Sequence, residues 1–258
     1  MFPPVGRLLY IGLPRFIPWS LQEPILKDWA AAEGYEIWAV NEDSVKPSLL
    51  KHGPEAFMED LKAVVTAVVP YLQGDFVLVD SSFGPGTFLA WELRSMLKGV
   101  LIINAHLFNA PDFEKTEMAD KIRRRTAYLG ETYGKQDYDT ILTLLPDFMY
   151  PTGGAEGVEA TKLKYKAALE TASKNFWEMA KLQPSYNFEH MTSMFTSLPE
   201  WPLSSPPVVL AASDQAPLVV VGEAMRRLQQ IMPGSTLDFI PNSKWSWHLE
   251  GQAGLLNV

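Results

Sequence analysis

A short apolar run that ends in small and polar residues is the part of this sequence best suited to carry chemistry. Residues 76–79 read Phe-Val-Leu-Val, and residues 80–86 read Asp-Ser-Ser-Phe-Gly-Pro-Gly before a helical pattern begins. A buried parallel strand reads as such a run, and glycine and proline mark its end. A tight strand-to-helix turn would lift the Ser82 side chain clear of the sheet and aim the first N–H groups of the helix at the same place. The alternative is that Ser82 only caps the helix.

This turn resembles the nucleophile elbow of the α/β-hydrolase family, which reads G-x-S-x-G between a strand and a helix. The resemblance implies that Ser82 is the nucleophile and that Gly84 is the second glycine of the pattern. Asp80 stands at the first glycine position, which is normally small because the helix packs close to the turn. An alternative register puts Gly84 at the nucleophile position and leaves no nucleophile. We disfavour it because Asp80 and Ser81 would then lie inside the strand.

The resemblance extends to the loop after a first expected strand at residues 7–11. Family members often carry His-Gly here, and the backbone N–H that follows helps to hold an oxyanion. This sequence has Ile11-Gly12, so the histidine is absent. The N–H of Leu13 can still donate, because a backbone donor does not depend on side-chain identity. With the N–H of Phe83 it would form the oxyanion hole; the alternative is a plain loop.

Two residues near the C-terminus complete the implied triad. Asp214 follows the apolar run 207–212, where the family carries the acid that orients the catalytic imidazole. Its alternative role is to cap the next helix. Many relatives then read P-x-x-G-H-x-x-H-L-E with the first histidine catalytic, but here Trp245 takes that position and His248 matches the second histidine. Either the loop is rearranged so that His248 serves as the base, or the triad is broken, because tryptophan cannot accept the serine proton.

The elements that must position these residues alternate between strand and helix. Strands are expected over residues 7–11, 35–40, 76–79, 100–104, 207–213 and 236–240, and helices over 21–32, 54–72, 88–97 and 218–231. This alternation predicts an α/β fold with a mostly parallel sheet covered by helices. Functional loops of such sheets lie at the carboxyl ends of the strands. Gly12, Asn41, Ser82 and His106 all fall there, which indicates one shared site, although His106 could also be an ordinary loop residue.

Residues 106–201 have a different composition, in which helical patterns replace strands. The expected helices span 114–130, 136–145, 159–182 and 188–198. Hydrolases of this type often carry a helical cap at this point. The resemblance therefore implies a core of residues 1–105 and 202–258 with an inserted cap of residues 106–201. A minority of the cap's many aromatic side chains should line a largely apolar pocket.

The composition limits the class of protein. The chain has 258 residues, of which 47% are hydrophobic, and no cysteine. One sizeable core is expected, since α/β domains of this size are commonly single. Without cysteine neither disulfides nor a thiolate metal site can form, which fits a reducing compartment. The N-terminus lacks the features of a signal peptide. The sequence also contains no apolar run of about eighteen residues, the length needed to cross a membrane. We therefore expect a cytoplasmic protein.

The distribution of charged residues indicates which partners and cofactors to expect. The net charge is −8, and no basic patch with interleaved aromatic residues stands out, which argues against nucleic acid. No His/Asp/Glu cluster has metal-site spacing and no phosphate loop occurs, so no metal and no cofactor are predicted. A small apolar ligand or substrate is the expected partner, and a homo-oligomer is compatible with the sequence.

The constellation predicts a serine hydrolase that cleaves a small-to-medium apolar ester, thioester or lactone through an acyl-enzyme. Ser82, Asp214 and His248 occur in the family's order of nucleophile, acid and base. The departures at Ile11 and Asp80, together with that at the usual histidine position, are what a repurposed or inactive member would show.

Two alternatives therefore stay open. The first is a lyase or cyclase without an acyl intermediate, in which Asp80 does acid–base work. The second is a non-catalytic binder in which Trp245 and Trp247 pack on an apolar ligand.

Overall fold

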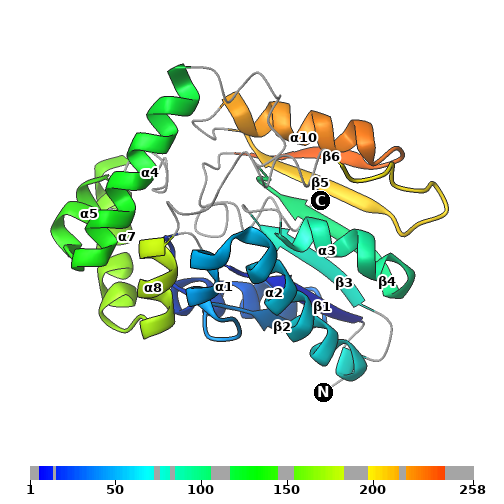
Figure 1. Cartoon of the computed structure of the whole chain (residues 1–258), viewed down its shortest axis with the longest axis horizontal. Coiled ribbons are helices and arrows are strands. Elements are labelled where there is room, and N and C mark those ends of the chain that lie inside the picture. The colour runs from blue at the N-terminus through cyan, green and yellow to red at the C-terminus, as the bar shows by residue number, and fades with distance from the viewer. Residues whose placement is uncertain are drawn as a thin grey trace.

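The computed structural model describes residues 6–13, 16–72, 76–81, 85–105, 117–144, 154–182, 197–214 and 219–241. Within these residues one sheet of six parallel strands runs in the order β2-β1-β3-β4-β5-β6 (Figure 1). The strands are β1 (Gly6–Ile11), β2 (Tyr35–Val40), β3 (Phe76–Ser81), β4 (Leu97–Ile103), β5 (Val208–Ser213) and β6 (Thr236–Ile240). The predicted fold class, a parallel sheet covered by helices, is confirmed.

Helices cover both faces of this sheet. The α-helices are α1 (Trp19–Ala32), α2 (Pro54–Val68), α3 (Pro85–Leu93), α4 (Glu117–Lys135), α5 (Tyr138–Leu144), α7 (Gly154–Glu170), α8 (Lys174–Leu182) and α10 (Val219–Ile231), and the 3-10 helices are η1 (Pro47–His52), η2 (Val69–Leu72) and η3 (Arg94–Met96). Helices α2, α3 and α10 pack on one face and α1 packs on the other (Figure 1). Within the described residues, no helix is both long and apolar enough to cross a membrane.

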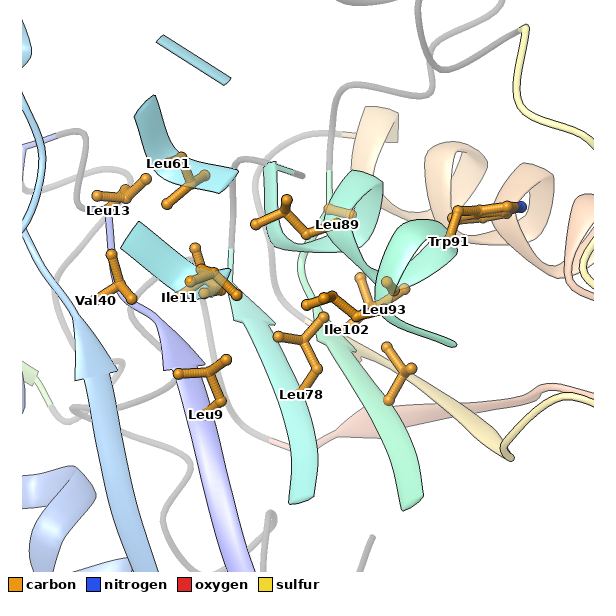
Figure 2. Close-up of a cluster of buried hydrophobic side chains, with 14 of the residues drawn as sticks. Leu9, Ile11, Leu13, Val40, Leu61, Leu78, Leu89, Trp91, Leu93 and Ile102 are labelled. Carbon is orange, nitrogen blue, oxygen red and sulfur yellow. The ribbon is translucent and has the colours of Figure 1, made fainter. Parts of the chain in front are cut away.

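The main core lies between the sheet and helices α2, α3 and α10. Alternate strand residues face these helices, so that Leu9, Leu78 and Ile102 belong to one buried cluster with Leu61 of α2 and Leu89 of α3 (Figure 2). Full burial of such aliphatic side chains contributes roughly 1.5–3 kcal/mol each. This core fixes the strands whose carboxyl ends carry the candidate site.

Two local predictions around the elbow were wrong. The helix after the elbow ends at Leu93 and not at residue 97, because Leu97 pairs with Phe76 and so begins β4. An apolar residue there suits a helix face and a strand equally well. Strand β3 also runs through Ser81, so Asp80 and Ser81 do lie inside it. Our ground for rejecting the alternative register of the elbow therefore fails.

The predicted helix 159–182 is in fact two helices. The Thr171 hydroxyl bonds to carbonyl oxygens of the preceding turn, Ala167 O and Ala168 O. The Ser173 hydroxyl accepts the N–H of Phe176 at 3.1 Å and so caps α8. Because Ser and Thr bond to nearby backbone groups, they compete with a continuous helix and favour such ends.

Helices α4, α5, α7 and α8 form a group beside the sheet, with a core of their own (Figure 1). We call them the helical group. Its core contains Tyr133, Ile141, Tyr165, Leu169, Phe176 and Ala180, together with Phe16 and Ile17 from the segment after β1. Lys51 of η1 and Glu178 of α8 form an ion pair at 3.6 Å. The predicted boundaries of the cap, at residues 105/106 and 201/202, stay a prediction.

Candidate functional site

The carboxyl ends of the strands meet at one edge of the sheet, because every described strand pair is parallel. Functional loops of such sheets lie at this edge. Strands β1 and β3 are neighbours, and Ile11 lies opposite Asp80. The ends of β1 and β3 therefore lie side by side at this edge.

Asp80, near the end of β3, is a buried cap for helix α3. Its side chain is 1% exposed, and Oδ2 accepts the backbone N–H of Thr87 at 2.7 Å and the Thr87 hydroxyl at 2.6 Å. Among the described residues Oδ1 has no hydrogen-bond partner of normal geometry. The nearby backbone N–H groups of Gly86 and Ser81 nevertheless lower the pKa of the Asp80 carboxyl. Burial outweighs these bonds and raises the pKa of Asp80 to about 6.

Gly86 in the first turn of α3 makes room for this carboxyl group. A Cβ atom on Gly86 would lie 2.8 Å from Asp80 Oδ1 and 2.9 Å from both Cβ and Cγ of Asp80. Contacts below 3.0 Å require the neighbour to move, and here the neighbour is the short, fixed end of a strand residue. The close approach of helix and strand thus requires a glycine on the helix. Our reading of the sequence missed this role, which the Gly-Pro-Gly at residues 84–86 could have signalled.

The chain leaves β1 at Gly12, where neighbouring aromatic rings leave no room for a side chain. A Cβ atom on Gly12 would lie 2.7 Å from Tyr10 Cδ1 and 3.2 Å from Trp19 Cζ3. The Gly12 N–H donates to Val40 O at 2.9 Å, which extends the pairing of β1 with β2. The side chain of Leu13 is buried in the main core close to α2 (Figure 2). The backbone of Leu13 is therefore held from both sides.

Glu42, just after β2, supplies the cap that helix α1 lacks. The residue before α1 is Pro18, which makes no side-chain bond to the helix, and Glu42 Oε1 accepts the N–H of Trp19 at 3.0 Å. A carboxylate at a helix N-terminus is also favoured by the helix dipole. Glu42 is 3% exposed and its Oε2 has no partner among the described residues. Burial raises the pKa of Glu42 to about 7, against the bond from Trp19.

Side chains from two other elements hold residues 16 and 17. We call residues 12–18 the β1–α1 loop; residues 14 and 15 lie outside the described part. Gln22 Nε2 donates to Ile17 O at 3.0 Å, and the Tyr10 hydroxyl donates to Gln22 Oε1 at 3.1 Å. The Tyr133 hydroxyl of α4 donates to Phe16 O at 2.9 Å. The loop beside the elbow is thus fixed to the sheet, to α1 and to the helical group.

Asn104, which follows β4, joins the ends of β4 and β5. It has a left-handed backbone with φ 52°, and its side chain is fully buried. Oδ1 accepts the N–H of Ser213 at 2.7 Å, and Nδ2 donates to Ser213 Oγ at 2.8 Å. The next residue, Asp214, is exposed and donates its N–H to Ile240 O at 3.2 Å. These bonds fix the backbone from which the Asp214 carboxylate projects.

Comparisons with known proteins assign this architecture at the level of fold. No protein-family model and no curated protein sequence matches the chain. The structure is similar to 2-hydroxy-6-oxo-6-phenylhexa-2,4-dienoate hydrolase from Rhodococcus sp. strain RHA1, with TM-score 0.65, 14% identity and coverage of 98% of this chain and 88% of that chain. The chain has the α/β-hydrolase fold.

Two further solved structures with this fold carry different activities in their names. A thermophilic esterase from Thermogutta terrifontis gives TM-score 0.62 and 15% identity over 97% of this chain and 86% of that chain. A bromoperoxidase from Bacillus anthracis gives TM-score 0.62 and 14% identity over 98% of this chain and 89% of that chain. At such identities the likeness shows the fold alone, because one fold hosts many chemistries.

Two departures from the hydrolase pattern lie within the described residues, and both have a structural account. Ile11, at the histidine position of the pattern, is buried in the main core (Figure 2). Asp80, which replaces a glycine, is accommodated by Gly86. The third departure, Trp245, lies outside the described residues.

The structure places three of the predicted site residues at the carboxyl edge of the hydrolase fold: Leu13, Asp80 and Asp214. The others lie outside the described residues, namely Ser82, Phe83, His106, Trp245, Trp247 and His248. Their roles stay predictions. In the described part of the chain, no three His, Asp or Glu side chains come together as metal ligands.

A cavity of about 450 Å³ opens at the opposite, amino edge of the hydrolase fold. It is lined by Arg94, Ser95, Leu97, Lys98, Ser204, Ser205 and Pro206. Arg94 donates to the carbonyl oxygen of Trp91 and so caps the end of α3. Because ligands of parallel sheets bind beyond the carboxyl ends of the strands, this cavity is separate from the candidate site.

The tight fit of Gly86 against Asp80 predicts a coupled pair. Gly86→Ala should lower the free energy of unfolding by about 1–3 kcal/mol, because the new methyl group clashes with the Asp80 carboxyl group. In the background of Asp80→Gly the same change should cost less, with a coupling energy of about 1 kcal/mol or more in urea denaturation. The control is Gly99→Ala, whose Cβ atom would be 3.5 Å from its nearest neighbour, Pro207 O. Strictly additive costs at residues 80 and 86 would refute the coupling.

The burial of Glu42 predicts a pH dependence of stability. Its pKa rises from 4.5 in the unfolded chain to about 7 in the folded protein, so folding takes up a proton between these values. Stability due to Glu42 is therefore full below about pH 4.5 and is lost as the pH rises to 7, by roughly 3 kcal/mol. Glu42→Gln should flatten this loss in urea titrations between pH 5 and 7.5. The exposed control Glu33→Gln should follow the wild-type curve; an equally steep loss in Glu42→Gln would contradict the assignment.

Proposed function

We propose that the chain is a serine hydrolase that cleaves a small-to-medium apolar ester, thioester or lactone through an acyl-enzyme. The observation that carries this proposal is the short connection between strand β3 and helix α3. Strand β3 ends at Ser81 and helix α3 begins at Pro85, so only residues 82–84 connect them. A connection this short, with the helix pressed against the strand at Gly86, supports the presentation of Ser82 at the start of α3.

In the proposed reaction the Ser82 hydroxyl attacks the substrate carbonyl carbon while His248 takes its proton. The oxyanion that forms accepts hydrogen bonds from the N–H groups of Leu13 and Phe83. The bond to the alcohol or thiol then breaks, the leaving group takes the proton from His248, and an ester on Ser82 remains. Water, deprotonated by His248, attacks this ester; the bond to Ser82 breaks, the Ser82 oxygen takes the proton from His248, and the acid is released. Asp214 orients the imidazole in both steps.

The described residues support two of these roles. The Leu13 backbone lies beside the elbow strand and is anchored by Gly12 and by its own buried side chain, as a preorganised donor requires. Asp214 follows a strand end that Asn104 holds in place, and it is exposed, so a partner imidazole can reach it. The role of His248 rests on chain order and on the resemblance.

We propose that the helical group is the cap of this enzyme. All four helices lie between β4 and β5 in the chain, and their core takes in Phe16 and Ile17 from the β1–α1 loop. That loop starts at the carboxyl edge of the sheet, beside the elbow. A cap in contact with it would exclude water from an apolar substrate pocket.

A second candidate function, a non-catalytic binder of an apolar ligand, is favoured by the charge of Asp80. At neutral pH a carboxyl with a pKa of about 6 is largely ionised, and this one lies against the N-terminus of α3. The negative charge opposes the positive end of the helix, which would otherwise stabilise an oxyanion at Ser82. The geometry gives less support to a lyase that uses Asp80, because both the carboxylate and Thr87, which binds it, are buried.

Covalent labelling with a fluorophosphonate probe tests the proposal directly. The folded wild-type chain should be labelled, because the probe reports an activated serine and mimics the acyl-transfer transition state. Ser82→Ala should abolish the labelling. The matched control is Ser81→Ala, the neighbouring serine, which should be labelled like the wild type.

Two results would overturn the hydrolase proposal. A folded wild-type chain that takes no label has no activated serine, which would favour the binder. Labelling that survives Ser82→Ala would place the nucleophile elsewhere. His248→Ala then separates the two readings of the histidine loop, since loss of labelling identifies His248 as the base.

A further inference from the structure

The hydroxyl group of Tyr133 in the helical group binds the backbone of the β1–α1 loop. Tyr133 is fully buried, with 0% exposure, and its hydroxyl lies 2.9 Å from Phe16 O and 2.8 Å from the Tyr165 hydroxyl. A tyrosine hydroxyl has a single proton, and a carbonyl oxygen can only accept. The Tyr133 proton therefore goes to Phe16 O, and Tyr165 donates to the oxygen of Tyr133. The two hydroxyls form a chain that ends on the loop.

Ring contacts reinforce this bond. The ring of Phe16 lies 5.0 Å from that of Tyr133, which also packs against Phe176 at 6.0 Å and Trp177 at 5.9 Å between centroids. Such tilted and edge-on pairs are favourable arrangements of aromatic rings. Phe16 belongs to the core of the helical group, whereas Leu13 belongs to the main core. Within three residues the chain passes from one core to the other.

Leu13 and Phe16 are only three positions apart in the sequence, so the positions of their backbones are linked. Three residues span about 10 Å at most when fully extended. Gly12 is tied to Val40 O at one end, and Phe16 O is tied to Tyr133 at the other. We therefore expect the position of the Leu13 backbone to depend on Phe16, in addition to Gly12 and the buried side chain of Leu13 itself.

We propose that Tyr133 is a positioning residue through which the helical group holds the β1–α1 loop and aims the N–H of Leu13 at the substrate oxyanion. This inference rests on the proposed hydrolase function. Tyr133 touches no reacting atom. It acts through Phe16, so its removal should impair the step in which negative charge develops and leave substrate binding nearly intact.

The chain offers a matched pair of variants. Tyr133→Phe and Tyr165→Phe each remove one hydroxyl from neighbouring, buried tyrosines, of 0% and 1% exposure. Only Tyr133→Phe breaks the bond to Phe16 O. In Tyr165→Phe, Tyr133 still donates to that carbonyl. A purely structural role for the hydroxyl pair would affect both variants alike.

The test combines hydrogen exchange and kinetics on the full chain. In Tyr133→Phe, the amides of residues 12, 13 and 15–17 should exchange about tenfold faster than in the wild type, while Tyr165→Phe should stay within about threefold. With p-nitrophenyl butyrate, Tyr133→Phe should lower kcat about tenfold with KM within about twofold, a fraction of the loss caused by deleting an oxyanion donor. Should Tyr133→Phe not fold, Phe16→Leu, which removes the other ring of the contact, should raise the same exchange.

The outcomes separate the inference from the proposed function. Equal exchange in the two tyrosine variants overturns the hold on the loop. Faster exchange in Tyr133→Phe with an unchanged kcat overturns the positioning role and leaves the hydrolase intact. Failure of the proposed function gives a different result: the wild type does not hydrolyse the ester, and Ser82→Ala does not abolish labelling. In that case the proposed role of Tyr133 in orienting the Leu13 N–H is overturned as well.

Discussion

The structure around the candidate site depends on how closely helix α3 approaches strand β3. At the point of contact there is room for one side chain, and Asp80 occupies it while Gly86 gives none. The hydrolase pattern places the small residue on the strand, and this chain places it on the helix. The absence of a side chain on Gly86 makes the room that the Asp80 carboxyl group needs. What changes is the chemistry beneath the turn, because a carboxylate now lies where the family pattern has a hydrogen atom.

That carboxylate serves the fold and opposes the proposed reaction. It satisfies the backbone N–H and the hydroxyl of Thr87, which would otherwise be unpaired in the first turn of a buried helix. The same N-terminus is the source of the positive potential on which an oxyanion at residue 82 would rely. Below its pKa of about 6 Asp80 is neutral and the conflict is weak; above it the carboxylate and the oxyanion compete for one helix end. A base such as histidine works best above that pH. The reaction would therefore need a neutral Asp80, which low pH favours, and an unprotonated histidine, which high pH favours.

The sheet could be predicted from sequence because its strands are short apolar runs bounded by polar and small residues. The points where helices and strands begin and end were harder to predict. Leu97 is an example, because one apolar residue fits a helix face or a strand until its partner Phe76 is known. The contacts that build the site were not predictable in this way. Asn104 and Ser213 are 109 residues apart, and Tyr133 and Phe16 are 117 residues apart. No local pattern encodes such a pair; only Gly86, within six residues of Asp80, left a signal in the sequence.

Residues 16 and 17 of the β1–α1 loop and the first residue of α1 are held from three directions, which supports the proposed donor role of the Leu13 N–H without the family's histidine. Glu42 holds the N–H of Trp19 from the β2 side, Gln22 holds Ile17 O from within α1, and Tyr133 holds Phe16 O from the helical group. None of these residues lies at a position that the family pattern specifies. A donor such as the N–H of Leu13 needs only a rigid backbone, and rigidity can be supplied by any set of buried polar contacts that are fully paired. The exception is Glu42, whose second oxygen has no partner among the described residues. Its protonation therefore changes the charge beside the start of α1.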